Sequence, residues 1–110
     1  MNIVKIIDEI NEKDAISLQD GLLVFNKIKN FIENKEKVEL DFVGIDLVLS
    51  TFLNPAIGQL YYLYDKDLVD SLLEYKNLMD VDNQTLKKVI QNAINQKENK
   101  PSINEGLING

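Results

Sequence analysis

The sequence predicts an α/β protein with a small, mostly parallel or mixed sheet whose helices lie mainly on one face. Three segments are β-branched or alternate apolar with polar residues, as strands do: residues 2–7, 38–43 and 72–76. Each is followed by apolar residues at helical spacing, and alternating strands and helices imply crossover connections between parallel strands. Glu39 and Asp41 alternate with apolar residues, so one face of the sheet is expected to be at least partly exposed.

The first strand is expected over residues 2–7, and the polar residues 8–15 are expected to form a turn. A helix is predicted to begin after Ser17, because its hydroxyl can cap the helix and Asp20 places negative charge in the first turn. Gly21 either allows close approach of a strand or is a tolerated first-turn glycine. The apolar stripe of this helix follows a spacing of three and four residues: Leu18, Leu22, Phe25, Ile28 and Ile32.

A second helix is predicted after the strand at residues 38–43 and a brief apolar run at residues 47–49. Asn54 and Pro55 fit its start, because a proline in the first turn loses no helical hydrogen bond. Its apolar stripe comprises Leu53, Ala56, Ile57, Leu60, Leu63 and Tyr64.

Two tyrosines of this helix lie outside the apolar stripe. At ~100° per residue, Tyr62 is nearly opposite the stripe and Tyr61 is at its margin. An exposed tyrosine is either ordinary surface or a contact for a partner protein.

The final strand is expected over residues 72–76, and Asp82 is expected to cap the last helix. The pattern then ends, so we expect one domain over residues 1–97 and a C-terminal tail over residues 98–110. The apolar stripe of the last helix comprises Leu86, Val89, Ile90, Ala93 and Ile94. The tail offers three apolar residues for packing: Ile103, Leu107 and Ile108.

The composition argues against several classes of function. The chain has no His and no Cys, which removes the usual zinc sites, Ser-His-Asp triads and disulfides, and all 12 basic residues are lysine. A net charge of −6 disfavours direct binding to nucleic acid or anionic membranes. No stretch reaches the ~20 apolar residues that span a bilayer, and no signal peptide is recognised. We therefore expect a cytoplasmic protein without a cofactor.

The acidic clusters are interpreted as surface and turn residues. Glu39 and Asp41 share a solvated strand face, with no nucleophile or apolar pocket implied beside them. Asp80, Asp82 and Asn83 resemble part of a calcium loop, but the required Gly and terminal Glu are missing. The sequence therefore predicts neither a catalytic residue nor a metal ligand.

Residues 38–60, VELDFVGIDLVLSTFLNPAIGQL, resemble the STAS-like domains of bacterial regulators. The shared pattern is a strand with Leu-Asp-Phe, a short apolar stretch, Ser and Thr, and then a helix with Asn and Gly. The chain is similar to the STAS-like family of unknown function over about residues 14–96, which implies a STAS-like fold.

Such domains resemble anti-sigma-factor antagonists, in which a kinase-like ATPase phosphorylates a serine at a helix N-terminus. By position the resemblance implies Ser50 as the phosphoacceptor, followed by Thr51, with Leu49 where the antagonist pattern has aspartate. A phosphate there would meet the positive end of the helix dipole and free N–H groups. The alternative is that Ser50 and Thr51 cap the helix by satisfying those same groups.

Two functional hypotheses follow. The first is a non-enzymatic regulatory module that docks on a kinase-like ATPase or another regulator, through Ser50, Thr51, Phe52, Asn54, Tyr61 and Tyr62. The second is a small acidic phage or mobile-element inhibitor that occupies the basic groove of a host nucleic-acid-binding machine. The abundance of Asn, Ile and Lys fits an AT-rich bacterial or phage genome. A homodimer formed through the last helix, the tail or a sheet edge remains open.

Overall fold

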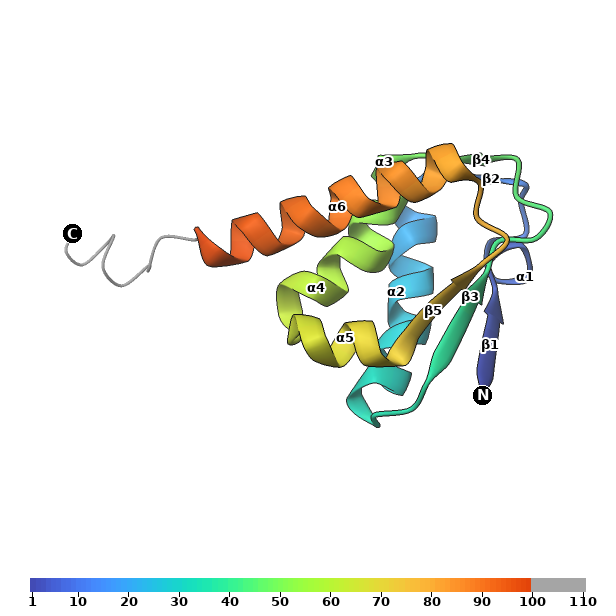
Figure 1. Ribbon diagram of the computed structural model, residues 1–110. Coiled ribbons are helices and arrows are strands. Elements are labelled where there is room, and N and C mark those ends of the chain that lie inside the picture. The colour runs from blue at the N-terminus through green and yellow to red at the C-terminus, as the bar shows by residue number, and fades with distance from the viewer. Residues whose placement is uncertain (100–110) are drawn as a thin grey trace.

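A computed structural model describes residues 1–99 and places the helices in a layer against one face of a small sheet (Figure 1). The sheet has three parallel strands in the order β1-β3-β5. Their bounds are Asn2–Lys5 for β1, Val38–Asp41 for β3 and Leu73–Lys76 for β5. The predicted α/β class with a parallel sheet is therefore confirmed.

The two faces of this sheet differ in burial. Val4, Leu40 and Leu73 point into the core and are at most 5% exposed. The opposite face is polar and at least partly exposed, and it carries Lys5, Glu39, Asp41, Glu74 and Lys76 together with Ile3. The longer helical segments all lie on the core side of the sheet: residues 18–33, 50–63, 66–72 and 80–98 (Figure 1). The predicted coverage of mainly one face is therefore confirmed.

The N-terminal strand is shorter than predicted. β1 ends at Lys5, and residues Ile6–Ile10 form the helix α1 rather than the end of a strand and a turn. Ile6 and Ile10 are one helical turn apart, so they lie on the same side of this short helix, and both are buried. Asn11 ends the helix in a left-handed conformation with φ 56°, and its N–H donates to the carbonyl of Ile7.

A second, two-stranded sheet lies beyond the end of the first. It pairs β2 (Asp14–Ala15) in parallel with β4 (Leu47–Val48). The pairing continues past the strands, because the N–H of Leu49 donates to the carbonyl of Ala15 at 3.0 Å. Segments far apart in the sequence are thereby brought together at the start of two helices.

The helix α2 (Leu18–Glu33) begins where the sequence predicted. The Ser17 hydroxyl accepts a hydrogen bond from the N–H of Asp20 at 3.1 Å. The predicted apolar stripe is only partly right, because Leu18 and Leu22 are exposed. The buried face comprises Gly21, Val24, Phe25, Ile28 and Ile32.

Gly21 explains why the buried face differs from the predicted stripe. A Cβ atom at this position would lie 2.4 Å from Cγ of Pro55 and 2.5 Å from the carbonyl oxygen of Phe52. The missing side chain therefore permits a close approach, as one of the two interpretations expected. The neighbour is a helix rather than a strand, and it contacts the side of α2 that carries Gly21.

That neighbour is one continuous helical segment over residues 50–63, made of α3 (Ser50–Leu53), the π-helix η1 (Asn54–Gly58) and α4 (Gln59–Leu63). The prediction that this helix starts at Asn54 and Pro55 is wrong by one turn. Pro55 lies inside the segment, within the wider π turn. A proline in a helix interior lacks the N–H and crowds the carbonyl four residues earlier, so a locally altered turn is the expected accommodation.

Two further helices complete the fold. α5 (Lys66–Leu72) was not predicted; Asp65 caps it by accepting from the N–H of Leu68 at 3.2 Å. α6 (Asp80–Glu98) begins before the predicted cap, so Asp82 lies in its first turn and Met79 occupies the cap position. Its buried residues are Leu86, Val89 and Ala93, with Ile90 and Ile94 partly buried against the core.

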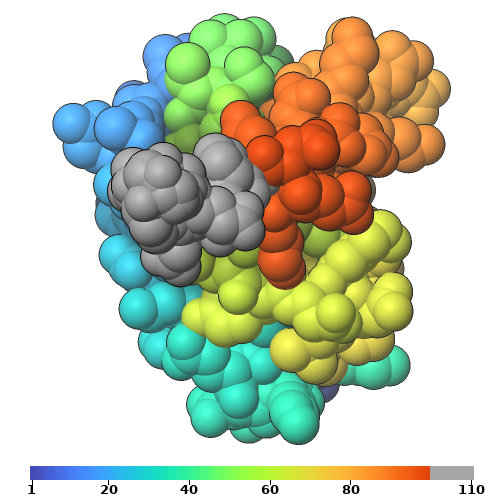
Figure 2. Space-filling view, turned by 90° about the vertical axis from the view of Figure 1, so that its left-hand side faces the viewer, coloured from blue at the N-terminus to red at the C-terminus, as the bar shows by residue number. Residues whose placement is uncertain are grey.

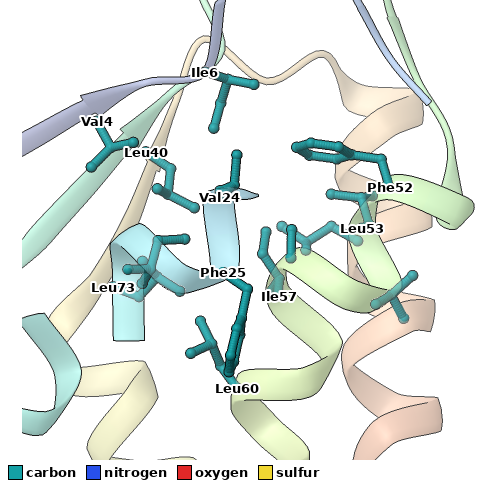
Figure 3. Packing of buried hydrophobic residues seen from close by; sticks show 14 of the residues in the cluster. Val4, Ile6, Val24, Phe25, Leu40, Phe52, Leu53, Ile57, Leu60 and Leu73 are labelled. Atoms are coloured by element: carbon teal, nitrogen blue, oxygen red, sulfur yellow. The ribbon is translucent and has the colours of Figure 1, made fainter. Parts of the chain in front are cut away.

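The core lies between the sheet, α2 and the segment 50–63 (Figure 3). Figure 3 shows side chains from all three, together with Ile6 of α1, converging: Val4, Val24, Phe25, Leu40, Phe52, Leu53, Ile57, Leu60 and Leu73. Burying each large apolar side chain contributes roughly 1.5–3 kcal/mol. The predicted packing of Ile103, Leu107 and Ile108 lies outside the described residues.

Candidate docking surface

Exposed aliphatic side chains gather where the two-stranded sheet meets the start of α2. Of the twelve exposed large apolar residues among residues 1–99, five lie within residues 16–22 and 47–49. We call this group the Leu49 surface; it comprises Ile16, Leu18, Leu22, Leu47 and Leu49, which are 38–55% exposed. Contiguous exposed apolar surface is a common mark of an interaction site.

The local geometry explains how these residues come together. Leu47 faces outward and Val48 inward, as alternation along a strand requires, so Leu49 faces outward again. The Thr51 hydroxyl donates to the carbonyl of Ile16, which joins the end of the small sheet to the start of α3. Figure 2 shows the first turns of α2, in blue, beside the segment around residue 50, in green.

Ser50 is exposed at the edge of this surface and is the first residue of α3. The cap position belongs to Leu49, which has an extended conformation and no side-chain cap hydrogen bond. Within residues 1–99, no hydrogen bond joins the Ser50 hydroxyl to another residue. The interpretation of Ser50 and Thr51 as caps is therefore wrong, because Thr51 bonds Ile16 instead.

Of the six residues predicted to contact a partner, four are at least partly exposed and two are buried. Ser50, Thr51 and Asn54 are exposed and Tyr62 is partly exposed. Two side chains belong to the core instead and cannot contribute contact area without rearrangement: Phe52 is 0% exposed and Tyr61 is 2% exposed.

The π turn accounts for the burial of Tyr61. A π turn holds one residue more than an α turn, so it rotates everything after it by about 100° relative to a regular helix. Tyr61, predicted at the margin of the stripe, turns inward as a result. Leu63, predicted within the stripe, turns outward and is 53% exposed.

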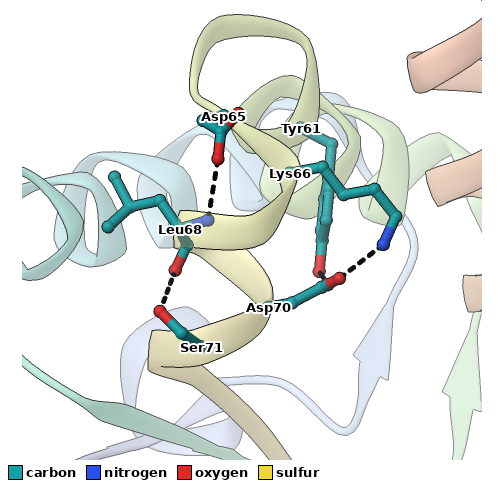
Figure 4. Close-up of polar contacts among 6 residues, drawn as sticks. All are labelled: Tyr61, Asp65, Lys66, Leu68, Asp70 and Ser71. Carbon is teal, nitrogen blue, oxygen red and sulfur yellow. Dashed lines mark hydrogen bonds and ion pairs between the residues drawn. The ribbon is translucent and has the colours of Figure 1, made fainter.

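Tyr61 anchors a small polar cluster that joins α4 to α5 (Figure 4). Its hydroxyl donates to Oδ1 of Asp70 at 2.5 Å, and Nζ of Lys66 lies 2.6 Å from Oδ2 of the same carboxylate. Burial raises the pKa of Tyr61. Burial also acts to raise the pKa of Asp70, but hydrogen bonds from Lys66 and Tyr61 outweigh it, so the pKa of Asp70 lies below its usual value. The cluster is a structural clamp with a neutral tyrosine and an ionised aspartate.

The hydroxyl of Tyr75 on β5 is buried near that of Tyr61, and no hydrogen bond of ordinary length and angle joins it to a residue among 1–99. Burial raises its pKa, so it stays protonated. Sequence reasoning missed this group, because nothing in the alternating pattern of a strand tells whether a tyrosine hydroxyl reaches water.

The acidic residues take structural positions. Oδ1 of Asp41 accepts from the N–H of Val43 at 3.0 Å and from Nδ2 of Asn77 at 2.7 Å, which ties together the ends of β3 and β5. Asp80 and Asp82 lie in the first turn of α6, where negative charge favours the helix dipole. Within the described part of the chain, no group of three or more His, Cys, Asp or Glu residues could hold a metal ion.

Comparison with protein-family models adds an independent observation. Residues 20–83 match the family described as STAS-like domain of unknown function (DUF4325). The chain belongs to this family. The match covers most of α2, the strands β3 to β5, the segment 50–63 and the start of α6, so this STAS-like domain contains most of the Leu49 surface and Ser50. No curated protein and no solved structure matches the chain.

Membership of the STAS-like family suggests a regulatory module that interacts with proteins. Among residues 1–99, none of the helices has the length and apolar character needed to cross a membrane.

Proposed function

We propose that this STAS-like protein is a non-enzymatic regulatory module that docks on another protein through the Leu49 surface, and that phosphorylation of Ser50 controls the docking. The observation that carries the proposal is an exposed serine hydroxyl at the start of a helix, bordered by exposed aliphatic side chains. The suspected partner is a kinase-like ATPase or another regulator, in line with the family resemblance.

The apolar character of the surface supports docking by burial. Leu18, Leu47 and Leu49 each keep 41–55% of their surface in water. Covering such side chains yields about 25 cal/mol for each Å² of apolar surface removed from water. A cluster of this kind can form the centre of a standard interface of about 800 Å² per partner, with Ser50, Thr51 and Asn54 at its polar rim.

The position of Ser50 supports a phosphorylation switch. Its hydroxyl is exposed and forms no hydrogen bond within residues 1–99, so a kinase would not need to break one. A phosphoryl group adds about −1.5 to −2 charges at neutral pH. Docking removes water from the neighbouring aliphatic side chains, so an unpaired charge beside them weakens the binding of the partner. Phosphorylation of Ser50 would therefore release the partner.

Affinity capture from the source organism tests the proposal, run at low and at high salt. A partner held by apolar burial is retained at high salt, and Leu49→Ser and Ser50→Asp should each release it, whereas Ser50→Ala should not. Leu63→Ser is the matched control, because Leu63 is also exposed, at 53% against 41% for Leu49, but lies on α4, away from the Leu49 surface. Equal loss with Leu63→Ser would contradict the docking surface.

The comparison between low and high salt distinguishes the two functional hypotheses. If the captured protein is a basic nucleic-acid-binding protein that is retained only at low salt, the inhibitor hypothesis replaces docking by apolar burial. The phosphorylation step is tested separately, by incubating the partner ATPase with ATP and mapping the phosphate by mass spectrometry. Phosphate that persists on the Ser50→Ala variant would contradict the assignment of the site.

A further inference from the structure

A groove of about 510 Å³ lies between the helical segment 50–63 and α6. Asn54, Gly58, Gln59 and Tyr62 line one side, and the lining from α6 is Asn92, Ala93 and Gln96. The groove shares Asn54 with the rim of the Leu49 surface, so it continues the same side of the molecule.

Small residues and one hydrogen bond shape the groove. A Cβ atom at Gly58 would lie 3.1 Å from Cγ1 of Val89 and 3.9 Å from Cβ of Ala93, so the two helices approach closely at its floor. Nζ of Lys97 on α6 donates to the carbonyl of Tyr64 at 3.0 Å and holds the helices together near the end of α4. The floor and this end are therefore fixed by the fold.

The lining has an unusual chemistry for this protein. The chain has 27% charged residues, yet the groove is lined by four carboxamides, one phenol and two small residues. Each carboxamide provides both hydrogen-bond donors and acceptors. The complementary ligand therefore presents donors and acceptors together, as a peptide group or another carboxamide does. A charged ligand would lose its hydration without gaining an opposite charge.

We infer that this groove binds an uncharged polar segment of the partner protein, through its peptide groups and through side chains such as Asn, Gln and Ser. The inference rests on the proposed function, since it adds a second contact beside the Leu49 surface. A pocket of this volume accommodates a drug-sized ligand, which corresponds to about two or three residues of extended chain. Apolar burial on the Leu49 surface supplies affinity, and the amide groove selects which segment lies next to it.

A peptide titration followed by NMR tests the inference. The full chain, labelled with ¹⁵N, is titrated with a blocked hexapeptide of Asn, Gln, Ser and Gly. The side-chain NH₂ signals of Asn54, Gln59, Asn92 and Gln96 should shift and saturate. The same peptide with its Asn and Gln replaced by Asp and Glu, or by Lys, should bind roughly tenfold more weakly.

Charge substitutions in the groove give a second test. The double variant Asn92→Asp with Gln96→Glu keeps the shape of the side chains but makes the groove anionic, and it should weaken the neutral peptide roughly tenfold. The control is Asn83→Asp with Gln84→Glu, which makes the same change of charge at exposed positions of α6 outside the groove. The control should bind the peptide as the wild type does.

The inference would be overturned by shifts that lie elsewhere on the protein, by equal binding of a charged peptide or by equal loss in the two double variants. Tighter binding of uridine, whose base also presents donors and acceptors but which has no peptide group, would overturn it as well. The Leu49→Ser variant separates this test from that of the proposed function, because Leu49 does not line the groove. If Leu49→Ser releases the captured partner while the peptide fails to bind the wild type, the docking function stands and the groove inference fails. If the peptide binds but no partner depends on Leu49, the docking function fails instead.

Discussion

Replacing Gly21 with alanine should destabilise the fold, although the same change in an ordinary helix stabilises it by up to about 1 kcal/mol. The new Cβ would lie 2.4 Å from Cγ of Pro55 and 2.5 Å from the carbonyl oxygen of Phe52. Favourable contacts between carbon atoms lie near 3.5–4.0 Å. The helix α2 and the segment 50–63 must therefore separate by about 1 Å to make room.

Neither neighbour can move out of the way by itself. One is a proline ring within the π turn, and the other is a backbone oxygen. Overpacking of a core costs about 1–3 kcal/mol, and a gap of 0.5–1 Å already forfeits a quarter to a half of each dispersion contact around it. After subtracting the gain in helix propensity, we expect a net loss of about 2 kcal/mol in the free energy of unfolding.

Urea unfolding followed by circular dichroism measures this loss directly, and thermal unfolding should show a fall in Tm of roughly 10 °C for a domain of this size. Gly58→Ala is the matched control. Its nearest neighbour is Cγ1 of Val89 at 3.1 Å, the end of a side chain rather than backbone, so its stability should stay within about 1 kcal/mol of the wild type. A Gly21→Ala variant as stable as the wild type, or no less stable than Gly58→Ala, would refute this account of the helix contact.

Three further predictions concern local contacts. Tyr61→Phe should lower the free energy of unfolding by about 1.5 kcal/mol in urea titration, since it removes a charge-assisted hydrogen bond to Asp70; an unchanged midpoint would contradict the clamp. Asp70→Asn should be less stable than the wild type at neutral pH, and the difference in stability should close as pH falls below 3.8, the usual pKa of an aspartate. The pKa of Asp70 in the folded protein is lower than this, so the stabilisation by its carboxylate is lost as acid protonates it. A gap that stays constant between neutral and acidic pH would speak against it. Ser17→Ala should cost about 1 kcal/mol through loss of the α2 cap, with faster amide exchange at Asp20 as the local readout.

The elements that depend on local patterns could be predicted from the sequence. Alternation identified β3, and the spacing of Phe25, Ile28 and Ile32 identified the buried face of the later part of α2. The Ser17 cap fixed where α2 begins, because capping involves only residues within one turn. The resemblance of residues 38–60 to STAS-like domains indicated the family, which the family comparison confirmed.

The candidate site depended on longer-range contacts. Ser50 and Thr51 looked like helix caps, but pairing between β2 and β4 brings Ile16 to Thr51 and leaves the Ser50 hydroxyl exposed. The groove between the segment 50–63 and α6 combines residues nearly forty positions apart, so no local pattern could indicate it.

Hydrophobic spacing by itself determined that α2 and the segment 50–63 each bury one face. Only the tertiary structure decided which face, because the close helix contact at Gly21 leaves Leu18 and Leu22 exposed, and the π turn at Pro55 rotates Tyr61 into the core. The physical reason is that burial of a residue depends on which side chains pack against it, and these come from parts of the chain that are distant in the sequence.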